Sequence, residues 1–199
     1  MAEEKHVDPS ALGLFGLAVV TLVASSQKMG ITNGTALVIP WAVFLGAFAQ
    51  LVAGMLDYKK GNVFGATAFC AYGFFWLAAA ATWLINLGAF GSALRDSADG
   101  GQLAFGFLSY LVFTLIMTVG AIETNKVLIT IFILIDFLFI GLTVSAFTGS
   151  HGFHVLAAYA ELFISIASFY GCAANVLNNH FGYSFLPVGK PMGIFVKRA

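Results

Sequence analysis

Six long runs of apolar residues account for most of the chain. They are separated by short polar segments and cover residues 11–26, 36–56, 63–94, 103–122, 127–147 and 153–177. Each run is long enough to cross the hydrocarbon core of a bilayer as an α-helix. The runs are continuous, whereas a membrane β-barrel requires short segments that alternate between apolar and polar residues. The pattern therefore predicts an all-α integral membrane protein, a bundle of six transmembrane helices in which short loops make neighbouring helices antiparallel.

Composition agrees with a lipid-embedded chain and argues against several function classes. Of the 199 residues, 60% are hydrophobic and 9% are charged, whereas soluble domains carry about 25% charged residues. The formal net charge is zero, which gives no attraction to nucleic acid. Neither a nucleophile–base pair nor a set of metal ligands is recognisable, and the apolar surroundings of Cys70 and Cys172 predict packing as small hydrophobic residues. We therefore expect no enzymatic activity, no metal and no cofactor.

Basic residues indicate how the bundle is oriented. With both termini on the cytoplasmic side, seven of the nine basic residues are cytoplasmic, namely Lys5, Lys59, Lys60, Lys126, Lys190, Lys197 and Arg198. Lys28 and Arg95 are then external, as the positive-inside rule requires. This predicts a multi-pass protein of the inner (plasma) membrane, with a cytoplasmic N-terminal segment (residues 1–10), a six-helix transmembrane domain (11–178) and a cytoplasmic C-terminal tail (179–199).

Two carboxyl groups interrupt the last two apolar runs. Asp136 and Glu161 lie at membrane depth, where a charge costs about 2.5 to 3.5 kcal/mol on insertion scales, so each must be protonated, paired or facing water. Ser165, Ser168 and Cys172 follow Glu161 at helical spacing, which places all four on one stripe of a helix. The stripe predicts either a solute path or helix-to-helix hydrogen bonds. A neutral Glu161 could donate a hydrogen bond to a passing carboxylate or exchange a proton with it.

Other polar residues within the spans are weaker candidates. Gln50 lies in the second run and Thr21 in the first. Because Ser and Thr in membrane helices often bond their own backbone, a local role competes with a place in a solute path. His151 and His154 share a helix face at the start of the sixth run, but without a third ligand they indicate interfacial histidines rather than a metal site.

Two stretches of the sequence carry a family resemblance. The first runs from Asp8 to Leu14, with Asp-Pro at its start and Leu-Gly-Leu at its end, and the second runs from Gln50 to Phe69 and continues through Tyr72-Gly73. The residues that carry the match are Asp8, Pro9, Leu12, Gly13, Leu14, Gly61, Asn62, Phe64 and Gly65. This pattern resembles the acetate uptake transporter family, also called succinate–acetate permeases. Asp8 occupies a motif position where that family usually has Asn, and Ala11, Val63 and Glu161 also depart from its usual residues, while Asp57 replaces Glu and keeps the charge.

The resemblance implies a specific architecture and substrate. It implies a six-helix protomer with its own pathway, assembled as a ring, a hexamer, that carries acetate, related small monocarboxylates and succinate, either as a channel or coupled to protons. It also implies a dry constriction formed by Leu17, Tyr72 and Ile135. An apolar neck passes a small acid with a methyl tail and hinders large hydrated ions, while the Tyr72 hydroxyl could orient a carboxylate. Further pathway candidates are Thr21, Gln50, Glu161 and Ser165.

The motif residues also have local structural interpretations. Asp8-Pro9 is a favourable start for a helix, and Gly61-Asn62 is favourable for the turn into the third span. If a helix N-terminus points into the pathway, its dipole attracts an anion.

Two alternative functions remain open. One is a pore for a small neutral solute such as ammonia, which is consistent with the scarcity of basic residues within the spans. The other is a structural membrane protein without transport, against which the polar stripe and the second motif argue.

Overall fold

The computed structural model of the chain describes residues 8–195. Six helical spans in it are long and apolar enough to cross a membrane, so the number of spans predicted from the sequence is confirmed. Residues 1–7 and 196–199 lie outside the described part of the chain, and with them Lys5, Lys197 and Arg198 of the orientation argument.

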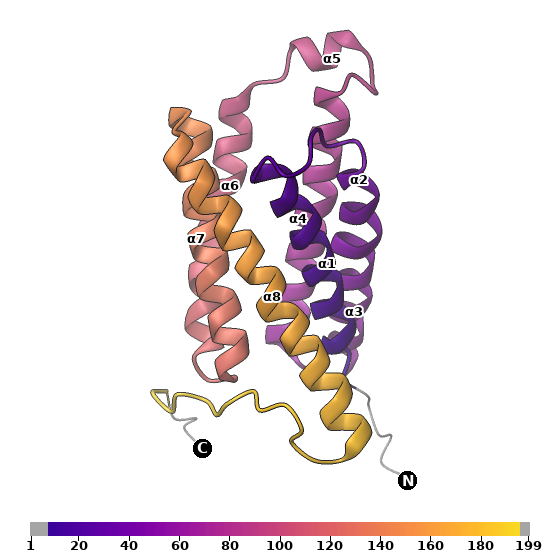
Figure 1. The fold of residues 1–199 in the computed structure, drawn as a ribbon, viewed down its shortest axis with the longest axis vertical. Helices are drawn as coiled ribbons and strands as arrows, with labels where there is room; N and C mark the ends of the chain where they lie inside the picture. Colours follow the sequence, from indigo (N-terminus) through magenta and orange to yellow (C-terminus); the bar gives the residue numbers. More distant parts are fainter. Residues whose placement is uncertain (1–7, 196–199) are drawn as a thin grey trace.

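Five of the six spans are continuous α-helices and one is composite. The continuous spans are α1 (Ser10–Lys28), α4 (Val63–Asn86), α6 (Gly100–Ala121), α7 (Lys126–Thr148) and α8 (His151–Phe181). The composite span joins α2 (Val38–Trp41), the π-helix η1 (Ala42–Ala49) and α3 (Gln50–Lys59). A short helix, α5 (Ser92–Asp96), lies in the connection between α4 and α6 at the top of Figure 1 and was not predicted.

The bundle is held together by α8, which crosses it diagonally in Figure 1. It packs against α1 on one side and α7 on the other, while α7 packs on α6 and α4 packs on η1 and α3. The first and last described residues lie at the same end of the bundle, the lower end of Figure 1. An even number of spans requires this arrangement.

Polar residues stop and start the helices at the positions where loops were predicted. The side chain of Asn62 accepts a hydrogen bond from the N–H of Gly65, and the side chain of Asn125 accepts one from Leu128. Both bonds satisfy backbone donors that the first turn of a helix leaves unpaired. Gly182 ends α8 in the left-handed conformation, with φ of 75°, which glycine adopts without steric cost.

The second span contains an irregularity that periodicity did not reveal. Pro40 lies in α2, directly before η1, and proline has no N–H to donate to the preceding turn. The wider π turns follow, and regular α-helix resumes at Gln50, whose Nε2 donates to the carbonyl of Gly46 at 2.7 Å. Such π segments are frequent at functional sites.

Glycines let α1 approach its neighbours closely. A Cβ atom on Gly13 would collide with the ring of Phe69 on α4, and one on Gly16 would collide with the backbone carbonyl oxygen of Leu45 in η1. Helices in lipid associate largely by such close packing of small residues.

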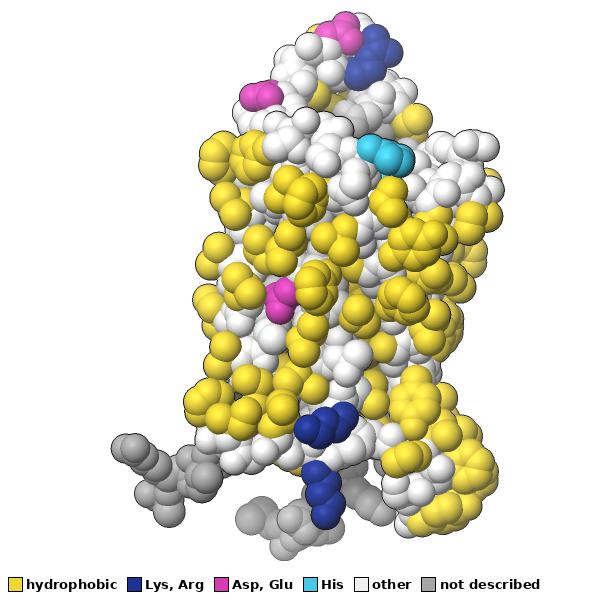
Figure 2. All heavy atoms as spheres, turned by 60° about the vertical axis from the view of Figure 1, so that its left-hand side comes forward, with side chains coloured by type: hydrophobic (Ala, Val, Ile, Leu, Met, Phe, Trp, Pro, Cys, Tyr) yellow, Lys and Arg dark blue, Asp and Glu magenta, His cyan; other side chains and the backbone are white. Residues whose placement is uncertain are grey.

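The outer surface matches a membrane protein. Figure 2 shows hydrophobic side chains over the middle of one face, Lys and Arg toward its two ends, and an acidic side chain at mid-height.

The segment after α8 folds back across one end of the bundle as a strap (residues 186–195), drawn in yellow in Figure 1. The N–H of Met192 donates to the carbonyl of Ile122. The Glu123 carboxylate accepts from the N–H groups of Gly193, Ile194 and Phe195 at 3.2, 2.7 and 2.9 Å. The strap is thus fixed to the loop between α6 and α7.

Candidate functional site

Two cavities lie one above the other inside the bundle. The first, the Gln50 cavity, has a volume of about 400 Å³ and is lined by residues from the start of α1, including Ser10 and Leu14. The second, the Lys28 cavity, has a volume of about 260 Å³ and is lined by residues at the end of α1, Gln27 and Lys28. Since a water molecule in the liquid occupies about 30 Å³, each cavity has room for a small organic acid.

The three residues of the expected constriction come together at the Gln50 cavity. Leu17 from α1, Tyr72 from α4 and Ile135 from α7 all line it. They are 7%, 5% and 4% exposed. Gln50 lines the same cavity and is fully buried, and its Oε1 has no hydrogen-bond partner among the described residues. This leaves one polar atom beside an otherwise apolar neck.

The hydroxyl of Tyr72 is already engaged. It lies 2.9 Å from Oγ1 of Thr114, and the Thr114 hydroxyl donates to the backbone carbonyl of Tyr110 at 2.8 Å. A threonine hydroxyl has one proton to donate, so Tyr72 is the donor to Thr114. The expectation that this hydroxyl orients a carboxylate therefore requires Tyr72 to break that bond first.

An aromatic layer separates the two cavities, and sequence reasoning missed most of it. Tyr72 lines the Gln50 cavity, whereas Phe75 and Tyr110 line the Lys28 cavity. Ring centroids are 6.4 Å apart for Tyr72 and Tyr110 and 5.0 Å apart for Phe75 and Tyr110. Phe139 stacks on Tyr110 at 5.5 Å. We define the aromatic layer as Tyr72, Phe75, Tyr110 and Phe139. The i, i+3 spacing of Tyr72 and Phe75 was its only sequence signal.

Helix N-termini surround the Gln50 cavity. Ser10 at the start of α1, Phe64 and Gly65 in the first turn of α4, and Leu128 in the first turn of α7 line it. Helix starts carry partial positive charge, which favours an anion at this end of the bundle. The N–H groups of Ser10, Gly65 and Leu128 themselves already donate to the side chains of Asp8, Asn62 and Asn125. The carboxylate of Glu123 lines the same cavity, but its oxygens already accept three N–H groups of the strap.

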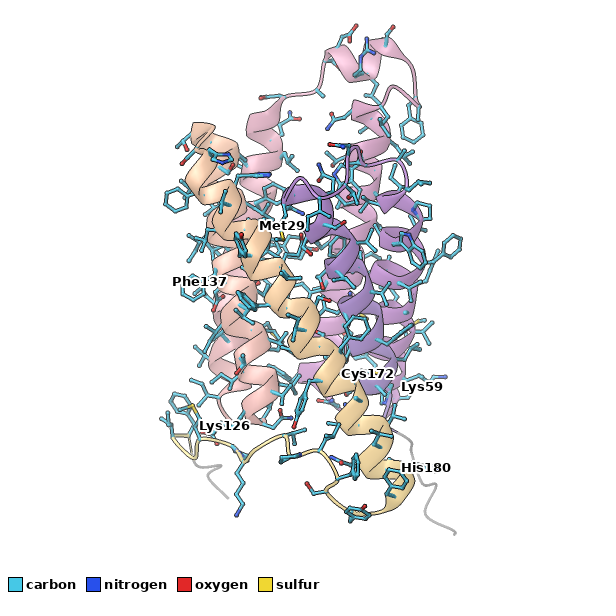
Figure 3. All side chains as sticks on the ribbon, viewed as in Figure 1. Met29, Lys59, Lys126, Phe137, Cys172 and His180 are labelled. Atoms are coloured by element: carbon cyan, nitrogen blue, oxygen red, sulfur yellow. The ribbon has the colours of Figure 1, made fainter. Side chains whose placement is uncertain are left out.

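The Lys28 cavity contains a buried ion pair. Nζ of Lys28 lies 2.9 Å from Oε2 of Glu161, and the two side chains are 13% and 2% exposed. The sequence analysis placed Lys28 at the external end of the bundle, and at this end its side chain turns inward to Glu161. Figure 3 labels the next residue, Met29, at the end of α1 within the outline of the bundle. Glu161 is paired rather than alone, because α1 brings in a cation that no spacing within α8 could reveal.

Two expected pathway residues lie elsewhere. The hydroxyl of Thr21 donates to the carbonyl of Leu17 within its own helix, and that of Ser165 donates across to the carbonyl of Ala18 at 2.7 Å. Neither residue lines the Gln50 cavity or the Lys28 cavity. The polar stripe of α8 thus serves the α1–α8 contact at Ser165 and reaches a cavity only at Glu161.

Asp136 also lies apart from both cavities. Its Oδ2 accepts a hydrogen bond of 2.8 Å from the Thr118 hydroxyl on α6, and its Oδ1 has no partner within the described chain. This supports the helix-packing interpretation. Within residues 8–195, no group of three or more His, Cys, Asp or Glu side chains could hold a metal ion.

The motif residues build the mouth of the Gln50 cavity. Leu14, Asn62, Phe64 and Gly65 line it. Gly65 has no room for a side chain, because a Cβ there would collide with the buried carboxylate of Asp57.

The other motif residues act on the backbone. Gly61 makes the turn before α4 with φ of 72°. Asp8 accepts the N–H of Ser10 at 3.0 Å, and the N-cap position of α1 falls on Pro9. Leu12 is 41% exposed on the outer side of α1.

Six apolar spans around two cavities, with an aromatic layer between them, are the features expected of a membrane transport protein. Residues 1–192 match the model of the GPR1/FUN34/yaaH family, and the chain belongs to this family, which is the acetate uptake transporter family that the motifs indicated. The family consists of transporters and not enzymes.

Relatives of known name align along nearly the whole chain. The succinate-acetate/proton symporter SatP of Escherichia coli (strain K12) is 32% identical over 191 residues, which are 96% of this chain and 99% of the relative. The structure of the bacterial acetate channel SatP superposes with a TM-score of 0.86 and 33% sequence identity, and the match covers 93% of this chain and 100% of the SatP chain. The ammonia transport outward protein 2 of Saccharomyces cerevisiae is 28% identical over 90% of this chain and 64% of its own length.

Proposed function

We propose that this protein moves acetate and related small monocarboxylates across a membrane, and succinate more slowly, through a path within each protomer. The observation that carries the proposal is the pair of cavities on either side of the aromatic layer. The Gln50 cavity is bordered by helix N-termini, and the Lys28 cavity holds an ammonium group that already binds one carboxylate, that of Glu161. The apolar layer between them suits a short methyl tail and disfavours large hydrated ions.

The names of two relatives support the same substrate class. One is called a succinate-acetate/proton symporter and the other an acetate channel. Leu17, Tyr72 and Ile135 form the neck in this proposal, with Gln50 beside it and Glu161 in the next cavity.

The proposal includes an orientation and an assembly. The strap end carries Lys59, Lys60, Lys126 and Lys190; Figure 3 labels Lys59 and Lys126 at this end. The opposite end carries Lys28 and Arg95, so the strap end is cytoplasmic by the positive-inside rule. Copies assemble into a ring, a hexamer. Exposed apolar side chains along α6, among them Phe105, Val112 and Ile116, are available to such contacts. The mass of the protein in mild detergent tests the hexamer.

Labelled acetate flux into proteoliposomes tests the function, with membrane potential and pH gradient varied separately. We expect saturable acetate uptake that exceeds the uptake of succinate and of longer monocarboxylates. A dependence on the pH gradient at fixed potential indicates proton coupling, and its absence indicates a channel. Acetate flux equal to that of protein-free liposomes, with the protein shown to be folded and inserted, would falsify the proposal.

A second candidate is passage of ammonia, which the yeast relative's name and the apolar layer favour. The same vesicles loaded with a pH dye distinguish it, because ammonia entry raises the internal pH and entry of an acid lowers it.

A further inference from the structure

The Lys28 cavity has a simple charge content. Among the described residues, Lys28 and Glu161 are the formally charged side chains that line it. Two other titratable side chains line the cavity: His154, which lies two turns before Glu161 on the same face of α8, and Tyr110 on α6. The lining residues from α4 and α7 carry no titratable group. Aromatic rings, including Trp76 and Trp83, make up much of the remaining wall.

Lys28 forms a site suited to binding a carboxylate, and the Glu161 side chain occupies that site. The Lys28 ammonium has three N–H donors, and Oε2 of Glu161 accepts at 2.9 Å. At this depth neither charge can lose its partner without a large penalty, because an uncompensated buried charge is strongly destabilising. A free carboxylate that enters the cavity offers Lys28 the same acceptor chemistry as Glu161 does. Exchange of one carboxylate for the other therefore keeps the cation paired throughout.

The exchange balances if one proton moves. A carboxylic acid RCOOH that enters transfers its proton to the Glu161 carboxylate, and the resulting RCOO⁻ takes the place of Glu161 beside the Lys28 ammonium. The products are RCOO⁻ paired with Lys28 and a neutral Glu161. The charge of the cavity is unchanged, and the reverse transfer releases RCOOH. No oxidant, metal or further reactant takes part.

We propose that Lys28 is the binding residue for the substrate's carboxylate in this second cavity, and that Glu161 is the internal carboxylate that the substrate displaces and that holds the proton meanwhile. This deepens the proposed function and rests on it. The site takes monocarboxylates whose short tails pack on the aromatic wall, and it forms a station distinct from the neck at the Gln50 cavity.

Acetate binding to the purified protein tests the assignment. Binding is followed by equilibrium dialysis of labelled acetate and by fluorescence of Trp76 and Trp83, which line the cavity, with chloride as the ionic-strength control. We expect Lys28→Gln to weaken acetate binding about tenfold or more, the effect of losing a hydrogen bond to a charged group. Lys59→Gln, which removes an exposed lysine at the other end of the bundle, is the matched control and should bind acetate as the parent does.

Proton linkage separates this role from a structural ion pair. In the parent, acetate anion binds together with one proton, so its Kd should rise about tenfold per pH unit while Glu161 is ionised. Glu161→Gln keeps the shape and is neutral, so we expect tighter acetate binding without pH dependence. His154→Gln should keep the pH dependence of the parent. A pH dependence that survives in Glu161→Gln and disappears in His154→Gln would overturn the assignment of Glu161.

A double variant guards against misfolding. Lys28→Gln alone strands the Glu161 charge, whereas Lys28→Gln with Glu161→Gln removes both charges and should fold. Lost acetate binding in the folded double variant supports the proposal. Parent-like binding in it, or no saturable binding in the parent, overturns the proposal. If the parent transports acetate while the double variant transports it equally well, the inference fails and the proposed function stands; if the parent transports no acetate, the proposed function itself fails.

Discussion

The phenolic oxygen of Tyr72 lies 2.9 Å from Oγ1 of Thr114, and this bond joins α4 to α6 beside the aromatic layer. Because Thr114 gives its own proton to the carbonyl of Tyr110, the phenol proton is directed at Thr114 and away from a solute in the Gln50 cavity. The ring of Tyr72 and its hydroxyl therefore have different roles: the ring lines the Gln50 cavity, and the hydroxyl joins two helices. Substitutions can separate them.

Replacing Tyr72 with Ala should change selectivity. The substitution removes a ring that contacts Tyr110 and Phe113 with centroids 6.4 and 5.6 Å away, so the neck widens and bulkier acids pass. We expect the flux of butyrate or benzoate to rise relative to acetate in proteoliposomes. Tyr72→Phe is the control: it keeps the ring and the acetate preference but loses one hydrogen bond, worth about 1 kcal/mol of stability. An unchanged flux ratio in Tyr72→Ala would show that the ring does not limit passage.

Gly16→Ala should destabilise the bundle. Its new methyl group would meet the backbone oxygen of Leu45, which cannot swing away as a side chain can, and such overpacking costs about 1 to 3 kcal/mol. Gly106→Ala in α6 is the matched control, since nothing lies within 4 Å of a Cβ there. That variant should gain about 0.5 to 1 kcal/mol, because alanine suits a helix interior better than glycine. Thermal unfolding in detergent measures both; equal melting temperatures would contradict the close approach of α1 to η1.

The strap should be released by acid. The backbone N–H of Phe195 holds the pKa of Glu123 below its ordinary value, and the N–H groups of Ile194 and Gly193 add to the effect. Because the pKa of Glu123 is lower when the strap is docked, the ionised carboxylate stabilises the docked strap at any pH above the undocked pKa of about 4.3. This stabilisation is lost as the pH falls through the lower pKa of the docked state. We expect amides 193–195 to be protected from hydrogen exchange at pH 5 to 7 and to lose protection below about pH 4.

Substitution of Glu123 checks the strap assignment at neutral pH. Glu123→Gln should raise the exchange rate of the same amides at pH 7, whereas Asp96→Asn at the opposite end of the bundle should not. Rates are corrected for the intrinsic pH dependence of exchange. Protection that persists at pH 3, or that is equal in Glu123→Gln and the parent, would show that other contacts hold the strap.

Asp136→Asn should leave transport unchanged. The amide oxygen can still accept from Thr118, 2.8 Å away in the parent, and the residue lines neither cavity. Thr118→Val should lower the free energy of unfolding by about 1 to 3 kcal/mol, because it leaves the buried Asp136 carboxyl group without its hydrogen-bond donor. Acetate flux and thermal unfolding, measured on both variants, decide the matter: a large loss of flux in a stable Asp136→Asn protein would make Asp136 part of the path.

Hydropathy revealed the six spans because lipid exposure forces long, continuous apolar runs. It could not reveal η1, since Pro40 was the only sign of irregular helix, or α5, which is short and exposed. The neck was predicted from motif resemblance, and its three residues do line one cavity. Thr21 and Ser165 were polar at the right depth but face backbone carbonyls. The pairing of Glu161 with Lys28 could not be predicted because the two residues are 133 positions apart in the sequence, and no local sequence pattern encodes a contact across such a separation.

The aromatic layer bears on how a cell keeps its membrane potential and proton gradient. A membrane that stores work as a voltage and a proton gradient loses both through any continuous thread of water. Tyr72, Phe75, Tyr110 and Phe139 place tilted, edge-on and stacked rings between the two cavities, and an apolar constriction of this kind hinders water and ions by dewetting. Under the proposed function, the rings part only while an acid of the right size passes, so a cell could keep many copies in its membrane and still hold its charge.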